Sequence, residues 1–435
     1  MPTALVVGAG LSGLSAAYRL KQSGWDAKVV EASHKAGGRA QTVHKDGYVF
    51  DIGPDGISSA YVAYLALLEE MGLGHMLEPS NPVAGIIRNG RVIDIDNSKI
   101  WSGMTTRALS LRAKLNFAIG QFRLRKQTRS VDGFEMARAG DLDDRYDNAL
   151  RFAERYFGKE VADHIIGPLC RISTGTSVNV SRLHVLGALS VWSAPLVSVR
   201  GGMDTLPLAL AANLDVELGR SIESVRKHGS EVVYTYQGDP AEHRADAAII
   251  ATQFDTACQI APSIAAISDG LDKRIKPCRL LLATLGYRKA TKSKAYFVTM
   301  PTVEDEDVLM LTLQHNKCSD RAPPGHSLVT VYIEDSGFDK FNAMSDEEVT
   351  AFSDDLISKL YPELKGHLDT SLISRWPRAL WVAQAGYYKD VKRLWEKMKP
   401  DDPIQLAGDI FSSASMENAV RFGAIAAKRL IENRA

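Results

Sequence analysis

The sequence predicts an α/β protein of more than one domain. The first 31 residues follow a strand–glycine–helix–strand pattern. The chain has 435 residues, of which 45% are hydrophobic, and this length suffices for two or three compact units. Lys+Arg 52 and Asp+Glu 52 cancel to zero net charge, which argues against a dedicated nucleic-acid binder, since such proteins carry excess positive charge.

The N-terminal pattern has a specific order. Residues 4–7 are apolar and predict a short buried strand of a parallel sheet. A Gly-rich run at 8–13 follows, then a helix over 14–22 and a second strand over 27–30, with Glu31 at the end of that strand. Strand, glycines, helix, strand and acid in this order predict a Rossmann-like dinucleotide-binding unit.

Each glycine of the run has a physical role in such a unit. Gly8 permits the tight turn, Gly10 lets the backbone approach a pyrophosphate, and Gly13 allows close packing of helix on strand. The helix N-terminus presents free N–H groups and a partial positive charge to the phosphates. Glu31 stands where a ribose-binding carboxylate belongs.

A second glycine pair follows the acid directly. In Gly37-Gly38-Arg39 the glycines let the chain pass close to the dinucleotide, and the guanidinium can clamp phosphate oxygens. This run resembles the "E…GGR" signature of the flavin-containing amine oxidase superfamily, which includes amine oxidases, protoporphyrinogen oxidases and phytoene-desaturase-type enzymes. The resemblance implies FAD rather than a nicotinamide as the cofactor.

Further segments resemble the same family in the same order. Arg200-Gly201-Gly202-Met203 and the helical pattern after it resemble the family's second glycine segment. Residues 404–409, ending in Gly408-Asp409, and residues 415–420 resemble the C-terminal "GD…EGA" motif, where Asn418 replaces the usual glycine. Asn418 implies either a left-handed backbone there or an altered contact with the cofactor.

Because the motifs lie at both ends and in the middle, the resemblance implies a discontinuous FAD-binding domain with an inserted α+β substrate domain. We place the FAD-binding domain at 1–80, 196–258 and 396–435, and the substrate domain at 81–195 and 259–395.

Carried over residue by residue, the resemblance implies a non-covalently bound FAD. The candidate catalytic residues are Trp381 and Tyr387, which either line the substrate face of the flavin or belong to the core. The expected cofactor contacts come from all three segments: Gly8, Gly10, Leu11, Ser12, Gly13, Glu31, Ala32, Gly38, Arg39, Gly53, Pro54, Ile222, Gly408, Asp409, Met416 and Ala419.

Segment order is most similar to protoporphyrinogen oxidases, but the substrate-binding positions differ. Ala84 stands where those enzymes have a propionate-binding Arg, and Ser415 stands where amine oxidases have a Tyr of their aromatic cage. Leu282 takes the place of the amine oxidases' Lys near flavin N5. We therefore expect an oxidoreductase that takes a hydride from a C–H of a small apolar substrate, giving desaturation, with O2 or a quinone as electron acceptor.

Three alternatives remain open at this stage. One is an amine or amino-acid oxidase, the second is an isomerase that uses flavin transiently, and the third is a non-catalytic FAD-binding protein. We expect no metal site, because the histidines show no ligand spacing. The oligomeric state stays open, with a homodimer as one alternative.

Residues 97–131 contain eight basic residues and no acid, interleaved with apolar ones. This segment predicts either a solvated helix pair or a contact with a membrane surface. We find neither a signal peptide nor a transmembrane run, and the four cysteines form no CxxC. We therefore expect a cytoplasmic protein with reduced thiols, either free in the cytoplasm or peripheral on the inner face of the membrane.

Overall fold

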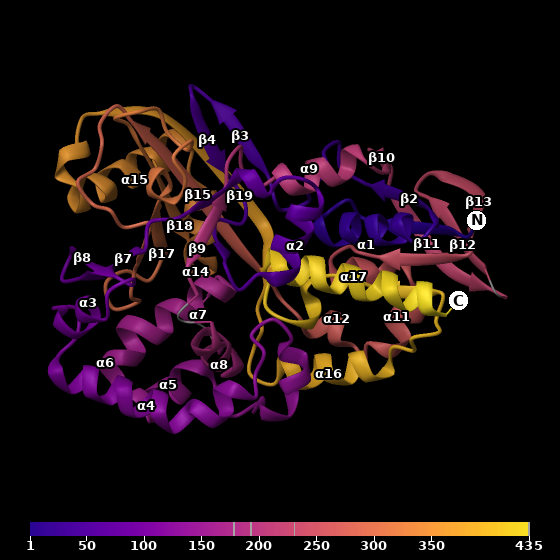
Figure 1. Cartoon of the computed structure of the whole chain (residues 1–435), viewed down its shortest axis with the longest axis horizontal. Coiled ribbons are helices and arrows are strands. Elements are labelled where there is room, and N and C mark those ends of the chain that lie inside the picture. Colours follow the sequence, from indigo (N-terminus) through magenta and orange to yellow (C-terminus); the bar gives the residue numbers. More distant parts are fainter. Residues whose placement is uncertain (177–178, 192–193, 230, 434–435) are drawn as a thin grey trace.

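Five parallel strands form the sheet that carries the N-terminal motif (Figure 1). The order is β10-β2-β1-β14-β20, and every neighbouring pair is parallel. The computed structural model describes residues 1–176, 179–191, 194–229 and 231–433. The strands are β1 (Thr3–Val7), β2 (Asp26–Glu31), β10 (Asp215–Leu218), β14 (Ala247–Ile250) and β20 (Ile404–Leu406).

The two faces of this sheet pack against different elements, because successive side chains along a strand point to opposite faces. Val6 and Ile249 pack with α1 (Leu11–Gln22), α9 (Thr205–Ala212) and α17 (Met416–Glu432). Leu5 and Ile250 pack on the opposite side with the antiparallel sheet of β11 (Ile222–His228), β12 (Glu231–Tyr236) and β13 (Asp239–Ala245), and with α10 (Phe254–Ile260) and α11 (Pro262–Ile267).

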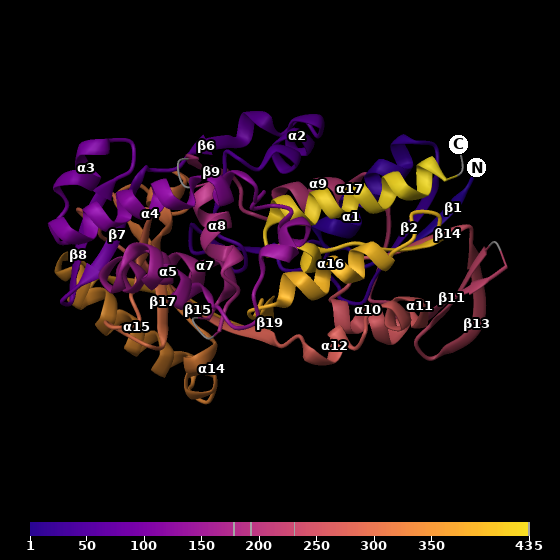
Figure 2. The ribbon, with the colours of Figure 1, turned by 90° about the horizontal axis from the view of Figure 1, so that it is seen from below.

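Helix α1 starts at Leu11, three residues earlier than the pattern predicts, with Gly10 as its N-cap. Gly13 therefore lies inside the helix. Helix α17 runs alongside α1 in both views (Figures 1 and 2). The two helices touch at Gly423, where a Cβ would lie 2.2 Å from the backbone oxygen of Ser12.

A seven-stranded sheet occupies the other end of the molecule, in the order β19-β15-β18-β17-β16-β7-β8 (Figure 1). Its outer face packs against α14 (Asp335–Asn342) and α15 (Asp346–Leu360). Its inner face carries a separate apolar cluster that includes Leu280 and Leu282. The strands are β7 (Val83–Arg88), β8 (Arg91–Asp96), β15 (Pro277–Tyr287), β16 (Phe297–Thr299), β17 (Val308–Leu313), β18 (Ser327–Ile333) and β19 (Leu368–Trp381).

A helical layer lies beside this sheet (Figures 1 and 2). It contains the helix pair predicted for the basic segment, α3 and α4, and α4 packs on α5 through Gly120, whose Cβ would lie 2.3 Å from Phe157. The helices are α3 (Ile100–Thr105), α4 (Leu111–Arg129), α5 (Ala149–Phe157), α6 (Lys159–Val161), a π-helical turn at Ala162–Ile166, α7 (Gly167–Thr174) and α8 (Leu183–Ser190).

Short elements connect these layers. They are β3 (Thr42–Lys45), β4 (Tyr48–Asp51), β5 (Ile57–Ser58), α2 (Val62–Glu70), β6 (Leu77–Pro79), β9 (Leu196–Val199), α12 (Leu271–Arg274), α13 (Gln314–Lys317) and α16 (Tyr387–Lys397), with 3₁₀ turns at Gly74–Met76, Met136–Leu142, Pro362–Leu364 and Asp409–Phe411.

The strands of the two large sheets fall on opposite sides of the predicted domain division: all five parallel strands lie within 1–80, 196–258 and 396–435. All four cysteines are buried free thiols. Within the described part of the chain, we find no helix with both the length and the apolar character that crossing a bilayer requires.

The crossing of α1 and α17 generates a stability prediction. Gly423→Ala should lower the thermal unfolding midpoint, because the new methyl would collide with Ser12 and the Ser15 hydroxyl. Such overpacking costs about 1–3 kcal/mol, more than the gain of about 1 kcal/mol in helix propensity. The matched control is Gly103→Ala in α3, where a Cβ meets no atom within 4 Å. Thermal denaturation followed by circular dichroism should show a lower midpoint for Gly423→Ala alone; equal midpoints for both variants would contradict the close crossing.

Candidate functional site

The three glycines of the first motif differ in their surroundings as the motif predicts. Gly8 has φ +105°, and a Cβ there would lie 2.9 Å from the backbone oxygen of Ala251. A Cβ on Gly13 would lie 2.0 Å from the Gly8 oxygen. A Cβ on Gly10 meets no atom within 4 Å. Gly8 and Gly13 thus serve the turn and the packing, whereas Gly10 borders open space.

The Glu31 carboxylate turns toward this loop. One oxygen accepts a hydrogen bond from the Ala9 N–H at 2.7 Å, and the other accepts from the Ser33 N–H at 2.9 Å. The backbone oxygen of Glu31 accepts from the Arg220 N–H at 3.0 Å. This contact brings the start of β11, where Ile222 lies, close to Glu31 and its neighbour Ala32, so two predicted segments meet here.

The second glycine pair packs on the first. The Gly37 N–H donates to the Ala9 oxygen at 2.8 Å, and Gly38, at φ +58°, comes so near that its Cβ would lie 3.1 Å from the Gly10 Cα. Arg39 donates to the Asp409 carboxylate at 2.8 Å and to the Ala379 oxygen at 2.9 Å. The N-terminal and C-terminal motifs are therefore joined by an ion pair.

The loop after β4 completes this junction. A Cβ on Gly53 would lie 1.8 Å from the Arg39 backbone oxygen, so only glycine fits there. The Trp376 indole N–H donates to the Ile52 oxygen at 2.5 Å. Gly53 and Pro54 therefore lie between the Arg39 segment and the seven-stranded sheet.

The C-terminal motif differs from one expectation. Asn418 is the third residue of α17 and is not among the described non-glycine residues with positive φ, so a left-handed backbone there is wrong. Its side-chain amide donates to the Ser413 oxygen, while its own N–H donates to Ser415, the N-cap, at 3.1 Å. The asparagine is thus used to fasten the loop before the helix. Met416 and Ala419 lie in the first turn of α17, and Gly408 has φ +133°.

The N-terminus of α1 has features that fit a phosphate group of a dinucleotide. The hydroxyl of Ser12, in the first turn of α1, is buried and has no hydrogen-bond partner within the described chain. The N-cap residue of this helix, Gly10, has no side chain that could cap the helix N-terminus. An unsatisfied hydroxyl and helix N–H groups beside an open glycine fit a phosphate group.

The two candidate catalytic residues are both largely buried. The Tyr387 hydroxyl donates to the Ile410 oxygen at 2.9 Å, next to Asp409. Burial, reinforced by the charge of Asp409, raises the pKa of Tyr387 well above its usual value, so this phenol stays protonated. Trp381 is the last residue of β19, and the centroid of its ring lies 6.0 Å from the central carbon of the Arg378 guanidinium. Whether either residue contacts substrate stays a prediction.

A buried ion cluster that the sequence does not predict lies next to this junction. The Lys317 ammonium contacts Asp51 at 2.7 Å and Asp55 at 2.6 Å, and Arg321 contacts Asp51 at 2.9 Å. Burial alone would raise the pKa of Asp51, but the charges of Lys317 and Arg321 outweigh it and lower that pKa to about 2. In the sequence, the two acids Asp51 and Asp55, on either side of Gly53-Pro54, could have indicated a charged site here. Nothing in the neighbouring sequence indicates their cationic partners.

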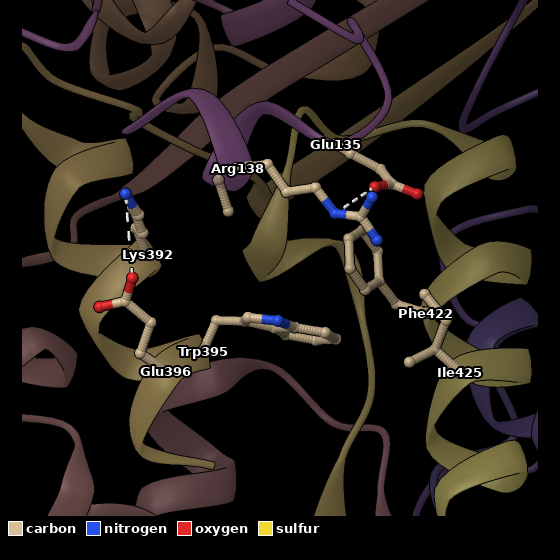
Figure 3. Close-up of a pocket in the computed structure, with 8 residues that line it drawn as sticks. Glu135, Arg138, Lys392, Trp395, Glu396, Phe422 and Ile425 are labelled. Carbon is tan, nitrogen blue, oxygen red and sulfur yellow. Dashed lines mark ion pairs between the residues drawn. The ribbon is translucent and has the colours of Figure 1, made fainter. Parts of the chain in front are cut away.

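A separate pocket of about 210 Å³ lies between the turn at Met136–Leu142 and helices α16 and α17 (Figure 3). Trp395 and Phe422 form its apolar walls, and its charged residues pair with one another, as Arg138 does with Glu135 at 2.6 Å. None of the predicted cofactor contacts lines it. The described residues also contain no group of three or more His, Cys, Asp or Glu placed to hold a metal ion.

Comparison with known proteins agrees with this geometry. The chain is similar to protoporphyrinogen oxidase 2 of Arabidopsis thaliana (30% identity over 165 residues, 38% of this chain and 30% of that enzyme). It is also similar to coproporphyrinogen III oxidase of Bacillus subtilis (20% identity, 96% of each chain). The fold matches cyclohexylamine oxidase of Brevibacterium oxydans with a TM-score of 0.75 at 18% identity, covering 100% of this chain and 99% of that one.

The plant enzyme is thus matched over about a third of its length, and the structural match shows the shared fold. The family model described as "Flavin containing amine oxidoreductase" matches residues 11–431, almost the entire chain. The protein therefore belongs to the flavin-containing amine oxidoreductase family and shares the fold of that family.

Proposed function

We propose that the protein binds FAD non-covalently and oxidises an apolar organic substrate by taking a hydride from a C–H bond. The observation that carries the proposal is the junction of the motifs: open space at Gly10, the unpaired Ser12 hydroxyl, and Arg39 joined to Asp409. These groups come from both ends of the chain and would surround one elongated dinucleotide.

The chain's own residues supply binding and orientation. The N-terminus of α1 would hold the pyrophosphate, Glu31 the adenosine ribose, and the Asp409 segment with the start of α17 the flavin end. When bound, the flavin supplies the hydride acceptor. Gly53 packs against the Arg39 backbone. Together with its neighbour Pro54, it would position the flavin ring system between the Asp409 segment and the inner face of the seven-stranded sheet.

The inner face favours an apolar substrate. Leu280, Leu282, Met310 and Ala379 form one buried cluster there, with Trp376 packed against it. Such a surface excludes water and holds a C–H bond in place, which is what hydride transfer requires of the protein. The acceptor that reoxidises the flavin would be O2 or a quinone.

The alternatives receive less support. Amine oxidation is less favoured, because Leu282 and Ser415 are found where amine oxidases are expected to have a Lys and a cage Tyr. A flavin-dependent isomerase or a non-catalytic FAD-binding protein would use the same cofactor site. Reduction of the flavin by candidate substrates distinguishes an oxidoreductase from both.

We also propose that the protein contacts the cytoplasmic face of a membrane through α3 and α4. One side of α4 is buried at Ala113 and Leu124, whereas Leu115 and Phe122 on the opposite side are 61% and 64% exposed. Trp101 in α3 is 69% exposed. Apolar side chains surrounded by cations are typical of helices that lie in the interface of an anionic bilayer. The cations are Lys99, Arg107, Arg112, Lys114, Arg123, Arg125, Lys126 and Arg129.

A first test addresses the cofactor. Gly10→Val should abolish FAD retention, because the isopropyl group would fill the space that the pyrophosphate needs. The fold should survive, since Gly10 has φ −73° and its Cβ meets no protein atom within 4 Å. FAD released on denaturation should fall from near one per chain to below a tenth, while circular dichroism stays unchanged. Gly103→Val, also in open space, serves as the control. A yellow, FAD-replete Gly10→Val protein would refute the assignment.

A second test addresses the reaction. Under anaerobic conditions, apolar cyclic alkenes or ketones should bleach the visible absorbance of the oxidised flavin, and primary amines should not. Bleaching by amines with release of ammonia would establish amine oxidation instead. Catalysed isomerisation without net reduction would indicate an isomerase, and a flavin that no member of the panel reduces or turns over would favour a non-catalytic protein.

A third test addresses the membrane. The wild-type protein should float with vesicles of phosphatidylcholine and phosphatidylglycerol at low salt, and binding should weaken at high salt because salt screens the lipid charge. Leu115→Glu combined with Phe122→Glu should reduce flotation at least tenfold. Val62→Glu is the matched control, since Val62 is 66% exposed on α2. Failure of the wild type to float with anionic vesicles at low salt would disprove the contact.

A further inference from the structure

The apolar inner face of the seven-stranded sheet ends in a polar cluster, and Tyr332 belongs to both. Tyr332 on β18 pairs across the sheet with Leu282 on one side and with Met310 on the other. Residues opposite each other on neighbouring strands share a face. The tyrosine ring therefore lies in the apolar surface, at its centre, and its hydroxyl marks the place where polar groups begin.

The polar groups beside it come from the loop after β4 and from α13. One Asp55 oxygen accepts from the Lys317 ammonium at 2.6 Å and from the Gln314 amide at 2.8 Å. The same Gln314 amide donates to Thr312 at 2.7 Å. Three atoms of this cluster are buried and make no hydrogen bond of good geometry in the described chain: the second Asp55 oxygen, the Gln314 carbonyl oxygen and the Tyr332 hydroxyl, which lies near Asp55.

Such atoms are costly to bury, because each has lost its water without gaining a well-formed hydrogen bond. Two of the three can only accept a hydrogen bond, and the hydroxyl can accept or donate. What would satisfy them together is a group with a hydrogen to donate.

The charge of the cluster indicates which donor group. Lys317 lies between Asp51 and Asp55, and Arg321 is paired with Asp51 and with the partly exposed Asp320, so each of the two buried carboxylates already has a cationic partner. Burial and the charge of Asp55 raise the pKa values of Tyr296 and Tyr332, so both phenols stay neutral. A cationic group on the substrate would gain little electrostatic stabilisation here, whereas a neutral donor leaves the charge of the cluster unchanged.

The cluster also adjoins the proposed cofactor site. Asp55 follows Gly53 by two residues, and Gly53 is wedged against Arg39. On the other side, Trp376 lies in the apolar surface and holds Ile52 of the same loop. A molecule lying on the inner face would therefore reach both the cofactor end of the loop and Asp55.

We propose that Asp55, Gln314 and Tyr332 form a polar subsite that binds a neutral hydroxyl or N–H group at one end of an otherwise apolar substrate. The inference deepens the proposed function, since it assumes that the substrate lies on the inner face of the seven-stranded sheet. The substrate class is then an amphipathic molecule with one hydrogen-bond donor, and the subsite fixes its orientation on the flavin.

The test uses three probes with the same flat apolar body: 2-naphthalenemethanol, its methyl ether, and 2-naphthylmethylamine. Binding to the purified protein is measured by naphthalene fluorescence anisotropy, which needs no flavin signal. The alcohol should bind about five- to tenfold more tightly than the ether, the value of one net hydrogen bond, and the amine at neutral pH should bind no better than the ether.

Tyr332→Phe removes only a hydroxyl that makes no hydrogen bond of good geometry, so the variant should fold, and its ratio of alcohol to ether affinity should fall about fivefold. Tyr361→Phe is the matched control, because the Tyr361 hydroxyl is also buried without a partner in the described chain but lies against the outer cluster of the sheet. Its ratio should equal that of the wild type.

Equal affinities for alcohol and ether in the wild type, or an unchanged ratio in Tyr332→Phe, would overturn the subsite. If the amine bound most tightly of the three probes, the subsite would prefer a cation to a neutral donor, and this result would also overturn the proposal. The flavin content of the same preparation reports separately on the proposed function, so a colourless protein that still prefers the alcohol would disprove the cofactor and leave the subsite standing.

Discussion

The Asp51 carboxylate is the contact on which the arrangement of the site depends. It is fully buried and accepts from Thr42 and from the Met203 N–H through one oxygen, and from Lys317 and Arg321 through the other. Removing one partner of a buried ion pair typically costs about 3–5 kcal/mol, because the remaining charge stays desolvated. These contacts therefore hold β4, the start of α9 and the segment after β17 in one fixed arrangement.

The loop that leaves Asp51 transmits this arrangement to the cofactor motifs. Gly53 packs against the Arg39 backbone, the Arg39 guanidinium pairs with Asp409, and Tyr387 binds the carbonyl next to Asp409. The sheet that carries the nucleotide motif and the seven-stranded sheet are thus connected through consecutive short contacts. These contacts help to fix their relative position, and a hydride transfer between two bound molecules would need such fixed positions.

The parts of this site that the sequence predicts are those whose cause is local. Gly8 needs a positive φ, Gly13 needs close packing, and Glu31 follows at a fixed spacing, so the motif is readable from neighbouring residues. The Lys317 and Arg321 contacts with Asp51 span 266 and 270 residues, and no spacing rule connects them. Asn418 shows the same limit, because its role depends on Ser413 at the preceding turn rather than on the motif it interrupts.

The proposed membrane contact on α4 and the proposed substrate-binding face of the seven-stranded sheet suit the same kind of molecule. Exposed Leu115 and Phe122 on α4 suit a bilayer, and Leu280, Leu282 and Met310 on the inner face suit a substrate that dissolves in one. An amphipathic molecule in a bilayer keeps its polar group at the interface and its apolar body below, and that polar group must find hydrogen-bond partners after extraction. Asp55, Gln314 and Tyr332 lie where that group would arrive, and their unsatisfied atoms would replace the water it leaves. The apolar face alone would bind such a molecule in either direction, whereas a single polar subsite fixes which of its C–H bonds meets the cofactor.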